Sequence, residues 1–250
     1  MSLYPSANGP VILKATSPQL HWPCIGTPIF SNDCCCPMND IQQLDNKRKE
    51  FRKSYTGVFF NSYLNIALVI IVFTTSLIFS GMRINWDFGA LLLFPVALLY
   101  AELALYAAHR YQQHNKIRFQ QRIFEMHTIW HHGMFSNEKI HVESLKDMNM
   151  VILPFFVHGF VLGLIYLPLG FLISILFKTD AGWIFMFAIT LHLVWYEFVH
   201  TLSHLKYPPF FTRLAKHHKE HHNPELMGKY NFGVTTTFFD RLFGTKYSGV

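Results

Sequence analysis

Charged side chains are scarce in this sequence of 250 residues. Lys, Arg, Asp and Glu together account for 14% of the residues, while hydrophobic residues account for 51% and aromatic residues for 16%. Soluble domains usually carry about 25% charged residues. This shortage excludes an ordinary soluble protein and indicates a membrane protein.

Cysteine is equally scarce, because the four cysteines all lie in the first 36 residues. A disulfide-rich scaffold is therefore excluded. The same N-terminal segment has scattered Pro, Ser, Asn and Gly without a sustained hydrophobic period, and it lacks the basic and apolar regions of a signal peptide. We expect residues 1–45 to be a disordered N-terminal segment and residues 46–250 to form one membrane-embedded domain.

The familiar catalytic and nucleotide-binding motifs are missing as well. The chain contains no G-x-S-x-G elbow, no Walker loop, no Rossmann fingerprint and no H-E-x-x-H. Its chemistry must therefore come from other residues.

Long uncharged runs are what the sequence does contain. Residues 54–82 and 148–177 hold no Lys, Arg, Asp or Glu, and two further apolar segments begin at Phe88 and Ala181. A helix needs about 20 apolar residues to cross the hydrocarbon core. The sequence predicts four membrane-spanning helices in two hairpins, with breaks in the third at Pro154, Gly159, Pro168 or Gly170.

Basic residues are distributed unevenly around these spans. Only Arg83 and Lys178 lie in the two short loops on one side, and the other 19 of the 21 basic residues lie before, between or after the hairpins. Positive residues are retained in the cytoplasm, so both termini and a helical cap made from residues 109–150 and the last 50 residues are expected there. The net charge of +6 then fits a basic face against anionic headgroups, and we expect no nucleic-acid partner.

The most informative residues are the histidines, of which there are 15. Ten form four spaced groups: His109 and His114; His127, His131 and His132; His200 and His204; His218, His221 and His222. Helical positions three or four apart share a face, so we expect His127 to converge with His131, His200 with His204, and His218 with His221 and His222. The five-residue spacing of the first pair requires a helix end or a local bulge.

Ten imidazoles exceed what one metal ion coordinates, so the sequence predicts two metals. Imidazole binds Zn, Cu, Fe and Ni alike, so the ligand type does not identify the metal. A dimetal site beside the membrane points to iron that activates O₂ to attack a C–H bond of an apolar substrate. Four other histidines are not expected to be metal ligands: His21, His141, His158 and His192. His217 is expected only to contact a ligand and not to bind the metal itself.

The pattern H-x4-H, H-x3-H-H, H-x3-H, H-x2-H-H, followed by "NFGVTTTFFDRLFGT", resembles the fatty acid hydroxylase and sterol desaturase superfamily of integral-membrane diiron oxygenases. The resemblance covers about residues 55–247. It implies an all-α, multi-pass fold in which the ten histidines hold two non-haem iron ions. It also implies that O₂ and two electrons are used to hydroxylate or desaturate a membrane lipid.

Details of the pattern bear on the substrate and the electron donor. The H-x3-H pair before "YPPFF" and the terminal FGT favour the hydroxylase branch, and "KYPPFFTRLAKHHKEHH" favours an acyl chain over a sterol. The chain has no haem-binding H-P-G-G. The resemblance therefore implies a separate electron donor of the cytochrome b5 or ferredoxin type. We expect the protein itself to lie in the endoplasmic reticulum membrane if it is eukaryotic and in the inner membrane if it is bacterial.

Three alternatives use the same residues. A sterol-type desaturase of the same superfamily would carry the same histidines. A zinc-binding membrane protein without redox chemistry would use the same ligands, since Zn²⁺ accepts imidazole but transfers no electrons. A metal transporter is disfavoured because its ligands should lie midway through the spans, whereas these lie at span ends.

Three carboxylates are candidates to hold the ligands in place. Glu102, Glu125 and Glu197 each precede a histidine, His109, His132 or His204, by seven residues, a spacing that returns to nearly the same helical face. A metal-bound histidine usually donates its second N–H to an acceptor. Glu102 and Glu197 lie within predicted spans, where carboxylates are costly and face a polar interior. We expect these two to act beside the site.

Overall fold

The computed structural model describes residues 40–54, 61–177, 179–206 and 212–249. These residues form helices and no strand, which confirms the predicted all-α class. The predicted disordered segment lies outside the described residues up to residue 39. Residues 40–45 begin helix α1, which ends at Ser54, and the domain boundary at residue 46 stays a prediction. The helices are α1 (Asp40–Ser54), α2 (Ser62–Gly81), α3 (Phe88–Ala107), η2 (Ala108–Gln113), α4 (Gln121–Phe124), η3 (Glu125–His131), α5 (His132–Met134), η4 (Leu145–Asp147), α6 (Met148–Val151), α7 (Phe155–Phe160), η5 (Val161–Tyr166), α8 (Leu167–Phe177), α9 (Ala181–Ser203), α10 (Thr212–His221) and α11 (Phe238–Leu242).

Four segments of the described chain are long and apolar enough to cross a membrane: Ser62–Gly81, Phe88–Gln113, Leu145–Phe177 and Ala181–Ser203. They match the four predicted spans. Large apolar side chains on them are exposed, among them Ile70, Leu92 and Leu176 at 58 to 66%. Such a surface is unfavourable in water and favourable in lipid.

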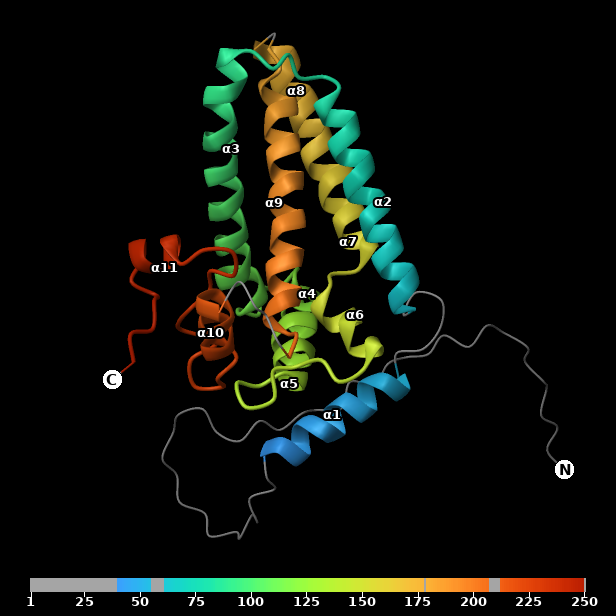
Figure 1. Ribbon diagram of the computed structural model, residues 1–250, viewed down its shortest axis with the longest axis vertical. Coiled ribbons are helices and arrows are strands. Elements are labelled where there is room, and N and C mark those ends of the chain that lie inside the picture. The colour runs from blue at the N-terminus through green and yellow to red at the C-terminus, as the bar shows by residue number, and fades with distance from the viewer. Residues whose placement is uncertain (1–39, 55–60, 178, 207–211, 250) are drawn as a thin grey trace, which may run out of the picture. The chain divides into compact units, whose positions relative to one another are not determined.

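Helix α9 is the central element of this bundle (Figure 1). In the apolar part of α9, 56% of the residues are buried, compared with 11 to 28% in the other three spans. The reason is that α2, α3 and α8 all pack against α9. Helix α8 approaches most closely, since a Cβ built on Gly182 would lie 1.8 Å from the carbonyl oxygen of Gly170. Only glycine permits that contact.

The third span is broken, as the sequence predicted. Helix α6 ends at Val151, the chain is extended at Ile152, and α7 starts directly after Pro154. The Oδ1 atom of the buried Asn65 on α2 accepts from the backbone N–H of Phe155 at 2.9 Å, so one donor of the new helix start is satisfied. The π-helical turn η5 interrupts the regular helix again before α8.

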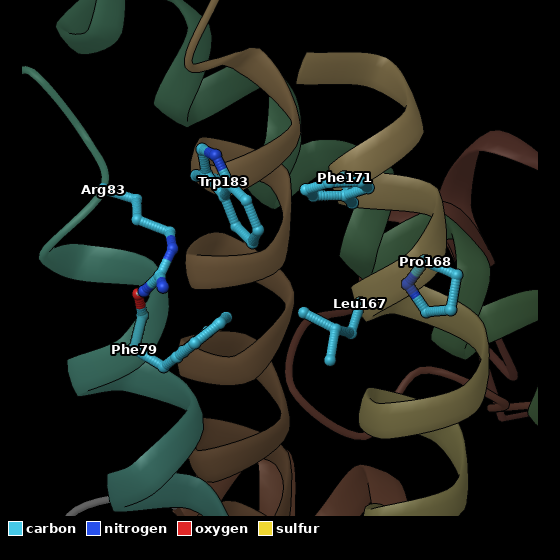
Figure 2. Close-up of a pocket in the computed structure, with 6 residues that line it drawn as sticks. All are labelled: Phe79, Arg83, Leu167, Pro168, Phe171 and Trp183. Atoms are coloured by element: carbon cyan, nitrogen blue, oxygen red, sulfur yellow. The ribbon is translucent and has the colours of Figure 1, made fainter. Parts of the chain in front are cut away.

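The short helices gather at one end of the long ones. Figure 1 shows α4, α5 and α10 at the ends of α3 and α9. We call this region the cap, which comprises residues 109–151, 200–206 and 212–249. A cavity of about 390 Å³ lies at the opposite end, lined by Arg83, Trp183 and four apolar side chains (Figure 2). It is separated from the cap by the length of the helices.

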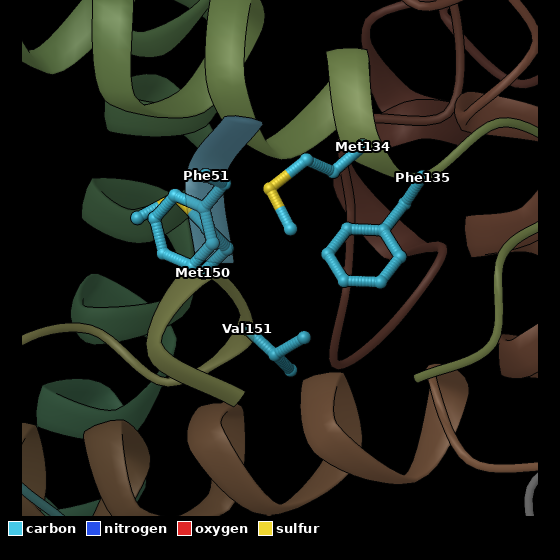
Figure 3. Close-up of a cluster of buried hydrophobic side chains, with 5 residues drawn as sticks. All are labelled: Phe51, Met134, Phe135, Met150 and Val151. Carbon is cyan, nitrogen blue, oxygen red and sulfur yellow. The ribbon is translucent and has the colours of Figure 1, made fainter. Parts of the chain in front are cut away.

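Helix α1 is bound to the cap by one face. Leu44, Arg48 and Phe51, spaced four and three residues apart, are its buried positions. Phe51 packs against Met134, Phe135, Met150 and Val151, as Figure 3 shows. Arg52 adds a bidentate ion pair with the buried Asp147, with N–O distances of 2.8 and 2.7 Å.

Arg48 is the buried anchor of this contact. Its Nε donates to the carbonyl of Met134 at 2.8 Å and one Nη to that of Lys139 at 2.7 Å. The other Nη lies 3.1 Å from Glu143. These bonds fix the loop that follows α5.

We expect Arg48→Met to destabilise the protein by about 2 to 4 kcal/mol, because the apolar side chain keeps the volume but leaves two buried carbonyls without a donor. Denaturant titration of the detergent-solubilised protein measures this. Lys49→Met on the exposed face of α1 is the control, and equal stability of the two variants would contradict the anchoring role.

Candidate metal centre

The ten predicted histidine ligands converge in the cap. Ring nitrogens lie within 4.8 Å of one another in each of two groups. The ring of His200 lies beside the second group, with its centroid 4.9 Å from those of His204 and His218. The first group contains His109, His114, His127, His132 and His221, and the second contains His131, His204, His218 and His222.

The two groups are neighbours. His131 and His132 are adjacent in the chain but belong to different groups, and so are His221 and His222. The rings of His132 and His222 stack with centroids 4.2 Å apart. Two metal ions held by these groups would therefore lie side by side.

The Nε2 atoms face one another within each group. Seven histidine pairs, such as His109 with His127 and His204 with His218, have Nε2 atoms 3.0 to 3.2 Å apart. Imidazole nitrogens bind Zn²⁺ at about 2.1 Å, and two such nitrogens at right angles around one ion are separated by about 3.0 Å. The spacing is that of a metal coordination shell.

Backbone carbonyls orient five of the rings through the opposite nitrogen. The Nδ1 atoms donate over 2.5 to 2.9 Å, and because a carbonyl only accepts, each Nδ1 carries the proton. The Nε2 atom is then left with a lone pair. The pairs are His109 with Phe232, His131 with Met150, His204 with Ile140, His221 with Tyr230 and His222 with Phe135.

The positions of the ring nitrogens and their protons show whether a metal ion fits this site. His131 and His222 both carry their proton on Nδ1, yet their Nε2 atoms lie 3.2 Å apart. Two lone pairs at that distance repel and form no hydrogen bond, whereas a cation between them binds both. The Nε2 atom of buried His200 likewise has no hydrogen-bond partner among the described residues. The donor set therefore fits metal ions.

Burial keeps these rings neutral. Desolvation lowers the pKa of His131 to about 4. Desolvation, followed by repulsion from neighbouring imidazoles, lowers the pKa of His132, His218 and His222 well below the usual 6.5. Neutral imidazole is the form that binds a metal.

Two π-helical turns decide which histidines share a group. In η2 and η3 the five-residue spacing converges, so that the Nε2 atoms of His109 and His114, and of His127 and His132, are each 3.2 Å apart. A helix end or a local bulge was predicted for the first pair, and the structure has a π-helical bulge directly after the end of α3. The prediction that His127 and His131 converge on one point is wrong, because it assumed a regular α-helix.

The last cluster also divides between the groups. The Nε2 atoms of His218 and His222, four apart, approach to 3.1 Å, whereas His221 turns into the first group. The prediction that all three converge on one point is therefore wrong as well.

Residues 94–245 match the family model described as fatty acid hydroxylase, and that range is more than half of the chain. The chain belongs to the fatty acid hydroxylase family. A stretch of 44 residues is 48% identical to the ceramide very long chain fatty acid hydroxylase SCS7 of Saccharomyces cerevisiae. This stretch is 18% of the present chain and 11% of the yeast protein, so the alignment spans about a tenth of that relative's length.

A solved structure has a similar fold. The structure described as full-length scs7p, with only the hydroxylase domain visible, superposes with a TM-score of 0.51. The match covers 75% of this family member and 67% of the other chain at 22% identity. It supports the helical fold with four candidate spans and a histidine-rich cap.

The predicted carboxylate partners are not found. Glu102 bonds to His192 instead of His109, Glu197 to His158 instead of His204, and Glu125 lies beside Arg122. The spacing argument failed because seven residues are two helical turns, about 10 Å along the axis, which is too far for a glutamate side chain to bridge. Carbonyl groups take that role for His109 and His204.

Three histidines outside the two groups each pair with a buried carboxylate. His217 pairs with Asp240 at 2.9 Å and His158 with Glu197 at 3.0 Å, and His192 pairs with Glu102. His141 belongs to neither group, and His21 lies outside the described residues. The expectation that His158 and His192 are not metal ligands agrees with these contacts.

Asp240 is the functional residue that sequence reasoning missed. It accepts from the backbone N–H groups of Phe232 and Gly233 at 2.9 and 2.8 Å, and from Thr245 and His217. These bonds shape the loop that carries two ligand-orienting carbonyls, those of residues 230 and 232. The D in "FFDRLFGT" marked its position in the family pattern but carried no spacing signal, because its partners are backbone groups.

We expect Asp240→Asn to weaken metal affinity about 10- to 100-fold, the usual effect of losing a residue that orients a ligand. The amide leaves one of the two backbone donors poorly paired and shifts the carbonyl that holds His109. Competition with a metal chelator measures the affinity. Glu225→Gln on the exposed surface is the control, and unchanged affinity in Asp240→Asn would contradict the role.

Proposed function

We propose that this family member is a membrane diiron oxygenase that hydroxylates a C–H bond in the acyl chain of a lipid. The reaction consumes one O₂, two electrons and two protons, and it yields an alcohol and one water. One observation supports it most: nine imidazoles form two adjacent groups with Nε2 atoms that face one another, and the ring of His200 lies beside the second group. Membership of the fatty acid hydroxylase family supports the reaction type.

The ten histidines are proposed as the ligands, five for each ion. Two iron ions bound there would supply the binding and reductive activation of O₂. The protein holds the ligand nitrogens through carbonyls of the cap, so that little rearrangement is needed when the ions bind. Buried packing around the cap excludes bulk water from an oxidising centre.

Glu197 is proposed to carry a proton for this chemistry. It lies three residues before His200, or nearly one turn of α9. Its Oε1 is held by His158 and by the backbone N–H of Leu153, at 3.0 and 3.3 Å. Its buried Oε2 has no hydrogen-bond partner among the described residues. A carboxyl with one oxygen free is suited to general acid work.

Sidedness and electron supply complete the proposal. The concentration of Lys and Arg around the cap supports a cytoplasmic location for the histidines. The two electrons are proposed to come from a separate protein of the cytochrome b5 or ferredoxin type that docks on this basic side. The substrate is a lipid that reaches the centre from the bilayer.

Metal analysis of detergent-purified protein from iron-replete cells tests the ligand set. We expect about two metals per chain, including iron, and about one fewer in each of His221→Ala and His218→Ala, because each variant damages a different group. His141→Ala is the control. Well-folded protein without metal would overturn the proposal.

Turnover with isotopically labelled O₂, a reduced donor and native lipids tests the reaction in the same samples. The expected product has gained one labelled oxygen atom, whereas loss of two hydrogens would indicate a desaturase. Bound zinc that iron does not replace, together with no oxidised lipid, would instead favour a zinc protein without redox chemistry.

Glu197→Gln separates proton supply from metal binding. We expect metal content to stay within error of the wild type and turnover to fall about 100-fold, within the usual contribution of general acid catalysis. Turnover and metal content are measured side by side. A fall in metal content equal to the fall in turnover would show that Glu197 acts only on the structure of the site.

A further inference from the structure

Two rings of the first histidine group are oriented by one short segment of the cap. The carbonyl of Tyr230 accepts from Nδ1 of His221 at 2.9 Å, and the carbonyl of Phe232 accepts from Nδ1 of His109 at 2.5 Å. We call residues 230–232 the orienting loop. The second group uses carbonyls from other parts of the cap, those of Phe135, Ile140 and Met150. Among these contacts, the orienting loop therefore serves the first group alone.

Asn231, the middle residue of the orienting loop, has an unusual backbone conformation. Its φ of 61° makes it the one residue other than glycine with a positive φ in the described part of the chain. This left-handed conformation is costly for most side chains and is tolerated best by asparagine and aspartate. Because φ fixes the rotation between successive peptide groups, the conformation of Asn231 contributes directly to how the two flanking carbonyls are turned.

The side chain of Asn231 fastens this loop to helix α10. It is buried, with 1% of the residue exposed. Its Nδ2 donates to the carbonyl of His217 at 3.2 Å and to Oε2 of Glu220 at 3.1 Å. Both acceptors belong to α10, which also carries His221. The loop that orients His221 is therefore held against the helix that carries it.

Asn231 is also bonded to the C-terminal residues of the described chain. Its Oδ1 accepts from the backbone N–H of Tyr247 at 2.8 Å, and its own N–H donates to the carbonyl of Thr245 at 2.7 Å. The Nδ2 atom thus faces a carbonyl and a carboxylate, while Oδ1 faces an N–H donor. An amide satisfies all of these partners, whereas a carboxylate of the same shape would place an oxygen against two acceptors.

We propose that Asn231 is a positioning residue that sets the metal affinity of the first histidine group alone, because it fixes the carbonyls of residues 230 and 232 relative to α10. The inference rests on one part of the proposed function, the binding of one ion by each group. It does not depend on the reaction or on the substrate.

Loss of the Asn231 bonds would act through the orientation of the rings. When the orienting loop moves away from α10, the Nδ1 atoms of His109 and His221 lose their acceptors. A neutral ring without that acceptor is free to carry its proton on Nε2, and a protonated Nε2 does not bind a metal ion. The second group keeps its own carbonyl partners and is expected to keep its ion.

Competition with an iron chelator tests this role without turnover. Full-length, detergent-purified protein is loaded with Fe²⁺ without oxygen, and bound iron is measured across a series of chelator concentrations. In Asn231→Asp we expect the affinity of the first group to fall about 10- to 100-fold and that of the second to stay unchanged. Over that range the variant holds about one ion per chain where the wild type holds about two.

Asn61→Asp is the matched control. The Oδ1 atom of Asn61 accepts from the N–H of Leu64 at 3.1 Å at the start of α2, and aspartate caps a helix as well as asparagine does. We expect this variant to bind iron like the wild type. Retention of both ions in Asn231→Asp, or equal weakening of both, would overturn the inference.

Double variants identify the ion that is lost. In His218→Ala, which damages the second group, the addition of Asn231→Asp is expected to remove most of the remaining iron. In His221→Ala, which damages the first group, the same addition is expected to change the iron content little, because both substitutions act on one ion. The reverse pattern would contradict the assignment to the first group.

Asn231→Gly repeats the test if the aspartate variant does not fold. Glycine adopts a φ of 61° without strain but lacks the side-chain bonds, so we expect the same selective loss. Asn231→Ala lacks these bonds and is also strained, and its first group is expected to bind iron about tenfold more weakly than that of Asn231→Gly. Wild-type affinity in both variants would overturn the role of Asn231.

The outcomes separate this inference from the proposed function. Selective loss of one ion in Asn231→Asp, in a protein whose wild type oxidises no lipid, would contradict the proposed reaction and support the positioning role. Lipid oxidation by the wild type, with both ions retained in Asn231→Asp, would contradict the positioning role alone.

Discussion

The structure depends on holding ten imidazoles close together, nine of them in two groups whose ring nitrogens lie within 4.8 Å of one another. The lone pairs of His131 and His222, whose Nε2 atoms lie 3.2 Å apart, repel, and desolvation prevents relief by protonation, as the lowered pKa of His131 indicates. Metal ions are the natural solution to this repulsion. The cap holds the rings in the arrangement that such ions require.

Backbone carbonyls do most of the holding. They come from three places: the loop after α5, helix α6 and the segment around residues 230–232. Two of these are fixed from outside the site, the first by Arg48 on α1 and the last by Asp240. Residues far in sequence from the histidines therefore control the orientation of the imidazole rings through the positions of backbone carbonyls.

The central membrane helix carries polar residues from the cap into the bilayer. Helix α9 has His200 and its C-cap His204 at the cap end, Glu197 nearly one turn before His200, and His192 further into the bilayer. Polar residues thus follow one another along the central helix. This order suits the proposed lipid hydroxylation, because Glu197 and the proposed ligand His200 are carried by the same rigid element.

From the sequence alone follow the four spans, the all-α class and the set of ten histidines, because hydrophobic run length and histidine spacing are local properties of the chain. The bulge between His109 and His114 was predictable for the same reason. The division of the histidines into two groups was decided by tertiary structure, since the π-helical turn η3 overrides regular helical spacing. So were the partners of Glu102, Glu197 and Asp240, because these side chains and backbone N–H groups are far apart in the sequence and only packing brings them together.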